Sequence, residues 1–262
     1  MRLFEYRTDC NIRAFSTCRG GGSGNYESFN VTHYCGDTPE HVAECRKELC
    51  RELGIDDDRL LLPRQTHGNR VICIDKGFIE QPKQIQEERL HGIDAIITDL
   101  PNLCVGVSTA DCIPVLLYDG TKGIAAAVHA GWRGTVARIV QECVSQMRSR
   151  YGCDSGNIKA IIAPGISKEA FEVDDEVYET FKESGFDMER IAGRYPALQG
   201  EKWHIDLWEC NRMQLVEEGI REENIHVSAI CTYERYLDFF SARRLGVNSG
   251  RIFNGIMITD RA

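Results

Sequence analysis

Residues 105–140 read VGVSTADCIPVLLYDGTKGIAAAVHAGWRGTVARIV, and this stretch decides the fold. Two short apolar segments within it, residues 113–118 and 123–128, are bounded by turn residues and have the length and branched content of buried strands. If they pair as an antiparallel hairpin through the short DGTK turn, the first strand begins beside the end of the second. The hairpin therefore predicts that Cys112 and His129 are neighbours.

An amphipathic helix is expected to follow the second strand. Apolar residues recur at three- and four-residue spacing from Val136 to Met147, and Thr135 is the expected N-cap. Gly131 and Gly134 separate His129 from this helix. The arrangement predicts an imidazole beside free backbone N–H groups at the positive end of a helix dipole, a place that suits an anion.

Composition excludes several classes of protein. The chain has 262 residues, 42% hydrophobic and 27% charged, which is ordinary for a soluble globular protein, and we expect a single domain over 1–262. The formal net charge is −9 and the isoelectric point is near 5.4. Nonspecific binding to nucleic acid or to an acidic membrane surface needs a positive field, so neither partner is expected.

Cysteine usage and the amino terminus favour a cytoplasmic protein. No run approaches about 20 apolar residues, and the opening MRLFE lacks the apolar core of a signal peptide. The 12 cysteines are scattered through expected strands and helices, and no C-x-x-C occurs. Zinc ribbons and thioredoxin-type redox motifs are therefore disfavoured, and most of the thiols are expected to be buried as small hydrophobic groups.

Strands and helices are expected to mix along the chain without strict alternation. This order predicts an α+β (mixed α/β) fold, a mixed β-sheet core with flanking helices. Residues 75–91 are interpreted as a polar surface excursion, 185–200 as loop, and the glycine run 20–24 as a turn, since it lacks the P-loop pattern. Strands are expected over 11–17, 94–99, 157–165, 225–231 and 251–258. Helices are expected over 38–53, where Thr38 is the capping side chain, and over 206–218.

Three residues carry the expected chemistry: His67, Cys112 and His129, each in a turn at the end of a buried strand. Taken singly, each is a weak signal. Together, two imidazoles and a thiolate suit zinc, and three protein ligands leave the fourth position open for water or substrate, as in catalytic zinc sites. Metal-bound water is partly hydroxide near neutral pH and would supply a nucleophile. Without a metal, Cys112 is instead a candidate nucleophile activated by His129, and the sequence does not separate the two.

Asp111 and five arginines are candidates for the rest of the site. Asp111 precedes Cys112 and could act as a general acid or base, or equally as a carboxylate that caps a turn. Guanidinium groups offer planar donors for phosphate, although in an acidic protein the alternative is surface solubility. The candidate arginines are Arg46, Arg64, Arg133, Arg243 and Arg244.

Several blocks closely resemble the family once named multicopper polyphenol oxidase or laccase-domain proteins. The most specific are DCIPV at 111–115 and HAGWRG at 129–134, and the blocks RQTHG at 64–68 and FFSARR at 239–244 follow the same order. Similar proteins are described as zinc-dependent purine nucleoside enzymes. The family's His, Cys and His triad maps onto His67, Cys112 and His129.

The resemblance implies phosphorolysis of adenosine, inosine, guanosine and methylthioadenosine, together with deamination of adenosine. The implied cofactor is zinc, with copper possible because copper outranks zinc at most such ligands. Three alternatives stay open: copper-dependent phenol oxidation, amide hydrolysis in a cell-wall precursor, and a structural zinc module. Oxidation at a multinuclear copper cluster is disfavoured because none of the seven histidines forms an H-x-H pair.

Overall fold

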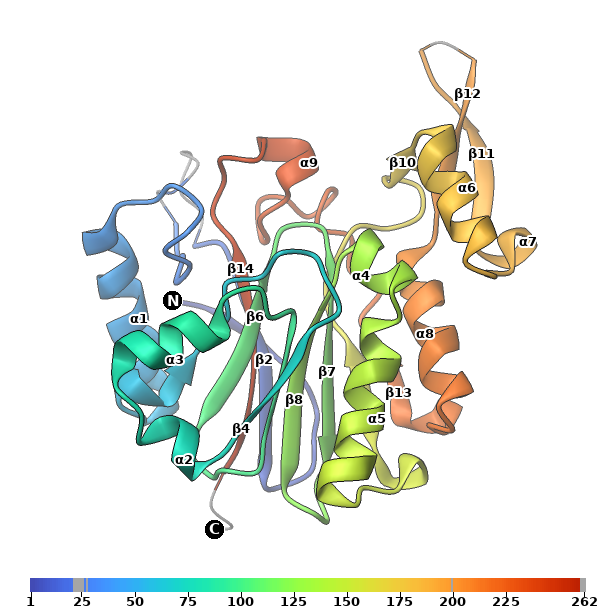
Figure 1. The fold of residues 1–262 in the computed structure, drawn as a ribbon. Helices are drawn as coiled ribbons and strands as arrows, with labels where there is room; N and C mark the ends of the chain where they lie inside the picture. The colour runs from blue at the N-terminus through green and yellow to red at the C-terminus, as the bar shows by residue number, and fades with distance from the viewer. Residues whose placement is uncertain (21–25, 27, 199, 260–262) are drawn as a thin grey trace.

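The computed structural model describes residues 1–20, 26, 28–198 and 200–259, and these form a mixed α/β fold, as the sequence predicts. Two large mixed sheets lie face to face, with helices on their outer faces (Figure 1). The glycine turn expected at 20–24 falls largely outside the described residues. Organisation as a single domain stays a prediction.

The hairpin at the centre of the chain is confirmed. Strand β7 (Ile113–Asp119) pairs antiparallel with β8 (Ile124–Ala130), and the register places Pro114 opposite His129. The turn between them is stabilised by the side chain of Asp119, whose Oδ1 accepts hydrogen bonds from the backbone N–H groups of Thr121 and Lys122 at 3.0 and 3.1 Å. The entry of β7 therefore lies beside the exit of β8.

This hairpin lies inside a six-stranded sheet that is buried on both faces. Val115 and Leu117 of β7 face helices α5 (Ile139–Tyr151) and α8 (Leu207–Glu217), whereas Leu116 faces the second sheet. Burial on both faces explains why β7 reads as a continuous apolar run instead of alternating. The strand order is β13 (Ile225–Val227), β9 (Lys159–Ile162), β7, β8, β5 (Ala95–Thr98) and β4 (Val71–Ile74).

The second sheet packs its outer face against α1 (Pro39–Leu53), which is capped by Thr38 as expected. Phe15 and Phe253 of this sheet belong to the same buried cluster as Leu49 of α1. The molecule is thus layered as helix, sheet, sheet and helix (Figure 1). The strand order is β1 (Leu3–Glu5), β2 (Ile12–Thr17), β14 (Ile252–Ile258), β6 (Cys104–Thr109) and β3 (Leu60–Leu61).

A small third sheet projects from the upper right of the molecule in Figure 1. Its strands, in order, are β10 (Glu172–Val173), β12 (Glu201–Ile205) and β11 (Ala192–Pro196). Trp203 of β12 stacks on Tyr178 of α6 (Asp175–Glu183), with ring centroids 3.9 Å apart, and fixes the helix on the sheet. The short helix α7 (Met188–Ile191) precedes β11.

Several predicted elements were wrong in detail. Thr135 is not an N-cap: it lies inside a short helix α4 (Trp132–Val136), and α5 starts separately after Arg138, whose φ of 62° interrupts the helix. The excursion at 75–91 is mostly exposed, as expected, and contains helices α2 (Lys76–Ile79) and α3 (Lys83–Leu90). Residues 185–200, expected as loop, instead contain α7 and β11. The strand expected over 225–231 ends at Val227, and the last helix is α9 (Ala242–Leu245).

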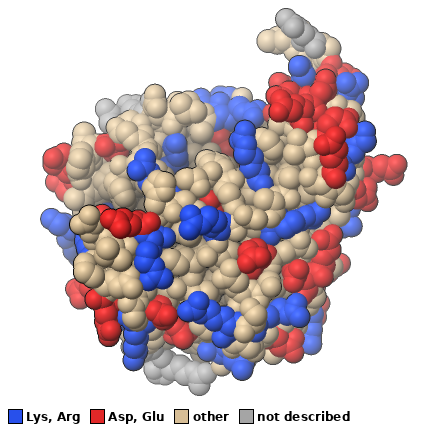
Figure 2. Space-filling view, viewed as in Figure 1, with Lys and Arg blue, Asp and Glu red and all other residues tan. Residues whose placement is uncertain are grey.

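Two surface properties bear on partners. On the face drawn in Figure 2, basic and acidic side chains are interspersed over the described residues and do not gather into one broad basic patch. No helix in the described part of the chain combines the length and the apolar character that crossing a membrane requires. On the face drawn in Figure 2, any anion would therefore be bound by a few neighbouring basic side chains and not by a broad basic surface.

We predict that Leu116→Ala lowers the free energy of unfolding by about 2–5 kcal/mol, because the leucine is fully buried between the two sheets and its loss leaves a cavity. Urea denaturation followed by circular dichroism measures the change. Ile85→Ala, at a side chain that is 41% exposed, serves as the control and should change stability little. Equal effects of the two substitutions would contradict the layered packing.

Candidate metal centre

The structure brings His67, Cys112 and His129 together. His67 lies in the loop between β3 and β4, Cys112 lies between β6 and β7, and His129 is on β8. One ligand atom from each lies within 4.8 Å of the others, and the two imidazole centroids are 4.8 Å apart. The prediction that Cys112 and His129 are neighbours is confirmed, and His67 lies beside both. These side chains are hereafter called the trio.

Exposure within the trio is graded from inside to outside. His129 is 2% exposed, Cys112 is half-buried and His67 is exposed. A small molecule can therefore approach the trio from the side of His67, while β7 and β8 close the other side. This gradation is typical of a site that exchanges a ligand with solvent.

Asp94 is a buried carboxylate that sequence reasoning did not assign to the site. It is 0% exposed, and its Oδ1 lies 2.8 Å from Nδ1 of His129. The same carboxylate accepts hydrogen bonds from the backbone N–H groups of Thr66, His67 and Gly68. The signal that identifies Asp94 is the pairing of β5 with β8, which puts the start of β5 beside His129.

Opposite charges stabilise one another inside the site. Burial acts to raise the pKa of the Cys112 thiol, but the positive charge of His129 and hydrogen bonds from both histidines outweigh it, and the pKa falls below its usual value. Burial acts to lower the pKa of His129, but Cys112 and Asp94 outweigh it and the pKa rises. Cys112 is thus held toward the thiolate, the form in which cysteine binds a metal.

Gly131 forms one wall beside the trio, and its missing side chain leaves a space open there. A Cβ added there would lie 3.0 Å from Cδ2 of His67 and 3.1 Å from Sγ of Cys112. Both distances are shorter than ordinary van der Waals contact, so any side chain at this position intrudes between the two ligands. Glycine therefore keeps a space clear beside the trio.

The donor set fits a metal ion. Tetrahedral zinc bonds of about 2.0–2.3 Å place two ligands of one ion about 3.3–3.6 Å apart. The ligand atoms of the trio lie within 4.8 Å of one another, so they would close by about 1 Å around an ion. Among the described residues, the trio is the one group of three or more His, Cys, Asp and Glu side chains that lie close enough together to hold a metal ion. A set of three protein ligands leaves room for a non-protein ligand.

Asp111 is engaged on both carboxylate oxygens. Its Oδ1 accepts a hydrogen bond from the hydroxyl of Thr232 and its Oδ2 accepts one from the backbone N–H of Arg243, each at 2.7 Å. The backbone φ of Asp111 is 88°, a strained value for a non-glycine residue. These contacts agree with the interpretation of Asp111 as a capping carboxylate. They also hold Thr232 and the backbone of Arg243 close to Asp111, the residue before Cys112. Its role as an acid or base stays a prediction.

Two of the candidate arginines are tied by sequence or contact to the residues of the site. Arg133 follows the Gly131 wall by two residues, is exposed, and lies over the ring of Trp132 at 4.2 Å. Arg243, also exposed, is held through the backbone by Asp111, and its guanidinium donates to the carbonyl oxygen of Glu172 at 3.1 Å. Within the part of the chain that the structure describes, the guanidinium of Arg243 makes this one hydrogen bond and that of Arg133 makes none, which leaves donors for a ligand.

The other three arginines lie in different surroundings. Arg244 lies between the rings of Tyr233 and Tyr236, at 5.1 and 4.8 Å. Arg64 is exposed and lines a pocket with His33 and Tyr34 that includes none of the trio.

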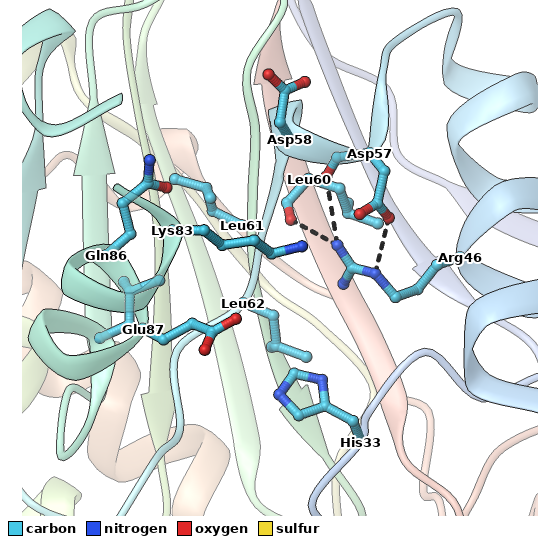
Figure 3. Close-up of a pocket in the computed structure, with 11 residues that line it drawn as sticks. His33, Arg46, Asp57, Asp58, Leu60, Leu61, Leu62, Lys83, Gln86 and Glu87 are labelled. Atoms are coloured by element: carbon cyan, nitrogen blue, oxygen red, sulfur yellow. Dashed lines mark hydrogen bonds and ion pairs between the residues drawn. The ribbon is translucent and has the colours of Figure 1, made fainter. Parts of the chain in front are cut away.

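Arg46, on α1, lines a second pocket whose lining also includes none of the trio. Figure 3 shows its guanidinium hydrogen-bonded to the carboxylate of Asp57 and to the carbonyl oxygen of Leu60, with Lys83 across the pocket. The structure therefore does not bring Arg46 together with the trio.

The comparison with family models identifies the class of protein. Residues 12–259 match the family described as multi-copper polyphenol oxidoreductase laccase. The chain belongs to this family.

Curated relatives of the chain include enzymes that act on purine nucleosides. A purine nucleoside phosphorylase from Bacteroides thetaiotaomicron is 46% identical over 250 residues, covering 95% of this chain and 92% of the relative. An adenosine deaminase from an unknown prokaryotic organism is 45% identical, covering 94% of this chain and 93% of the relative.

A solved structure shares the fold: YlmD from Geobacillus stearothermophilus has a TM-score of 0.85 at 27% identity, covering 95% of this chain and 93% of that one. The similarity extends over nearly the whole length of both chains. The two large sheets described above are thus part of a fold that is known from experiment.

We predict that Gly131→Ala weakens metal binding by about tenfold or more, the size of effect seen when groups supporting metal ligands are disturbed. The added methyl group would meet His67 and Cys112 and push the ligands apart. Titration with Co²⁺, followed by visible absorption, measures the affinity. Gly77→Ala is the matched control, since its Cβ would lie 3.5 Å from Asp75 in ordinary contact. Equal affinities of the two variants would show that the wall is not needed.

Proposed function

We propose that this protein is a zinc-dependent purine nucleoside phosphorylase that also deaminates adenosine. The observation that carries the proposal is the convergence of two imidazoles and a thiolate on one partly open site. The names of the relatives, purine nucleoside phosphorylase and adenosine deaminase, support the choice of substrates. The reactants are then purine nucleosides with phosphate or water, and the free thiols of all 12 cysteines suit a cytoplasmic enzyme.

His67, Cys112 and His129 would hold the metal ion. Zinc bound there would supply a Lewis acid and an activated water. The exposed side of the trio admits the substrate, and Gly131 leaves the space that the reacting group needs. The buried wall of β7 and β8 excludes water from the opposite side, which strengthens electrostatic interactions within the site.

Phosphate binding is assigned first to Arg133 and Arg243. Each has an exposed guanidinium: Arg133 follows Gly131 by two residues, and Arg243 is held through its backbone N–H by Asp111. A guanidinium offers paired N–H donors that match phosphate oxygens. Arg244, Arg64 and Arg46 are weaker candidates, because their surroundings are the tyrosine pair and the two pockets described above.

Phenol oxidation with copper is a second candidate, favoured by the description of the family model. A two-histidine, one-cysteine set binds copper through general affinity. Oxidases that reduce oxygen use several copper ions, however, and the described residues offer one cluster of ligands. We therefore place this activity behind the nucleoside reactions. A zinc-activated water could also hydrolyse an amide bond in a cell-wall precursor, but no feature of the described residues favours that substrate.

We predict that Cys112→Ala abolishes the phosphate-dependent release of hypoxanthine from inosine and of adenine from adenosine, since it removes one of three metal ligands. Chromatography of the purine products measures the rates. Cys10→Ala, at an exposed cysteine outside the trio, is the control and should retain full activity. If wild-type protein loaded with zinc releases no base from either nucleoside, the proposed function is wrong.

We predict that Arg243→Ala raises the KM for phosphate in phosphorolysis by about tenfold, roughly the 1.5 kcal/mol of one charge-assisted hydrogen bond. Adenosine deamination should change less, because its second substrate is water. The backbone N–H that binds Asp111 survives the substitution. Arg148→Ala, at an exposed side chain of α5, is the control. An equal loss in both reactions would assign Arg243 to the nucleoside instead of phosphate.

A further inference from the structure

We infer that Asp94 is a positioning residue that holds both histidines of the trio, one through its ring and the other through its backbone. This inference rests on the proposed function, since it concerns the same metal centre. Asp94 does not itself lie among the metal ligands. Its contacts instead reach two ligands that are 62 residues apart in the sequence, His67 and His129.

The contact with His129 fixes which ring nitrogen faces the metal. Oδ1 of Asp94 lies 2.8 Å from Nδ1 of His129. An ionised carboxylate only accepts hydrogen bonds, so Nδ1 must carry the proton and donate it. Nε2 is then the nitrogen available as a ligand. Because both side chains are buried, solvent does not compete for this hydrogen bond.

The contacts with the 66–68 loop fix the second histidine. Oδ1 accepts from the backbone N–H of His67 at 2.9 Å, and Oδ2 accepts from Gly68 at 2.9 Å and from Thr66 at 3.3 Å. His67 itself has a φ of 62°, a conformation that costs free energy in a non-glycine residue. Hydrogen bonds from three successive amides to one buried charge offset that cost. The loop is thereby held in the shape that points His67 toward Cys112.

These contacts make asparagine a poor replacement although it is nearly isosteric. Each oxygen of Asp94 accepts hydrogen bonds from two N–H groups, so either orientation of an amide sets its NH₂ against two donors. One orientation releases the amides of Thr66 and Gly68. The other releases His67 and forces His129 into the tautomer whose Nε2 carries a proton and cannot bind a metal. Both outcomes loosen one of the two histidines.

The chain offers a matched control in Asp119. It is also 0% exposed and also accepts hydrogen bonds from backbone N–H groups, but at the turn of the β7–β8 hairpin, the opposite end of the strands from the trio. In the described residues the hydrogen bonds that Asp119 accepts all go to Oδ1, so Asp119→Asn can keep them and removes a buried charge without touching the metal ligands. If Asp94 had a merely structural role, the two variants would bind zinc with the same affinity.

The test measures zinc affinity of the full chain by competition with a chromophoric chelator, together with the visible spectrum of the Co²⁺ form. We expect Asp94→Asn to weaken zinc binding by about 10–100-fold and to change the Co²⁺ bands. Asp119→Asn should keep the wild-type affinity and spectrum. Wild-type affinity in Asp94→Asn would overturn the inference. If the wild-type protein itself binds no zinc, the proposed function fails instead.

A measurement on the wild-type protein keeps the inference open to refutation even if Asp94→Asn does not fold. Hydrogen exchange followed by NMR reports on the amides of His67 and Gly68. We expect both to be protected, although the loop that carries them is largely exposed, because their acceptor is a buried carboxylate. Exchange at the rate of unprotected loop amides would show that Asp94 does not hold the loop.

Discussion

Antiparallel pairing of β8 with both of its neighbours is the constraint on which the rest of the structure depends. The pairing with β7 sets His129 opposite Pro114, two residues after Cys112, and the pairing with β5 sets Val128 opposite Ala95, the residue after Asp94. The register therefore brings a thiol, an imidazole and a carboxylate to the same end of one sheet. Because that sheet is buried on both faces, a slip of register would expose apolar side chains, and the register is strongly specified.

The remaining parts of the site follow from this arrangement. The buried charge of Asp94 needs donors, and the amides of the loop around His67 supply them, which brings the third ligand into place. Asp111 acts similarly on the other side of Cys112, where its carboxylate binds Thr232 and the backbone of Arg243. Two buried carboxylates thus tie two loops to one rigid sheet end. Sites held in this way keep their geometry because their supports cannot move independently.

The sequence predicted the parts of the fold and site that depend on local signals. The β7–β8 hairpin, the α1 cap and the trio were all readable, since apolar runs, turn residues and ligand types are properties of short stretches. Asp94 was missed because it precedes β5, and β5 pairs with β8, which lies about 30 residues further along the chain. No local sequence pattern predicts that pairing. The helix break at Arg138 was missed because the apolar spacing continues across it. The arginines are the least predictable, since the contacts of long exposed side chains depend on neighbours distant in sequence, as Arg46 and Asp57 illustrate.

The measurement that tests the central claim most directly is X-ray absorption at the metal edges of protein purified without added metal. The account predicts one zinc ion per chain, with one sulfur ligand at about 2.3 Å, two imidazole nitrogens at about 2.0 Å and a further light atom that belongs to no side chain. A copper edge in place of the zinc edge, a second sulfur ligand, or folded protein that contains no bound metal would contradict it.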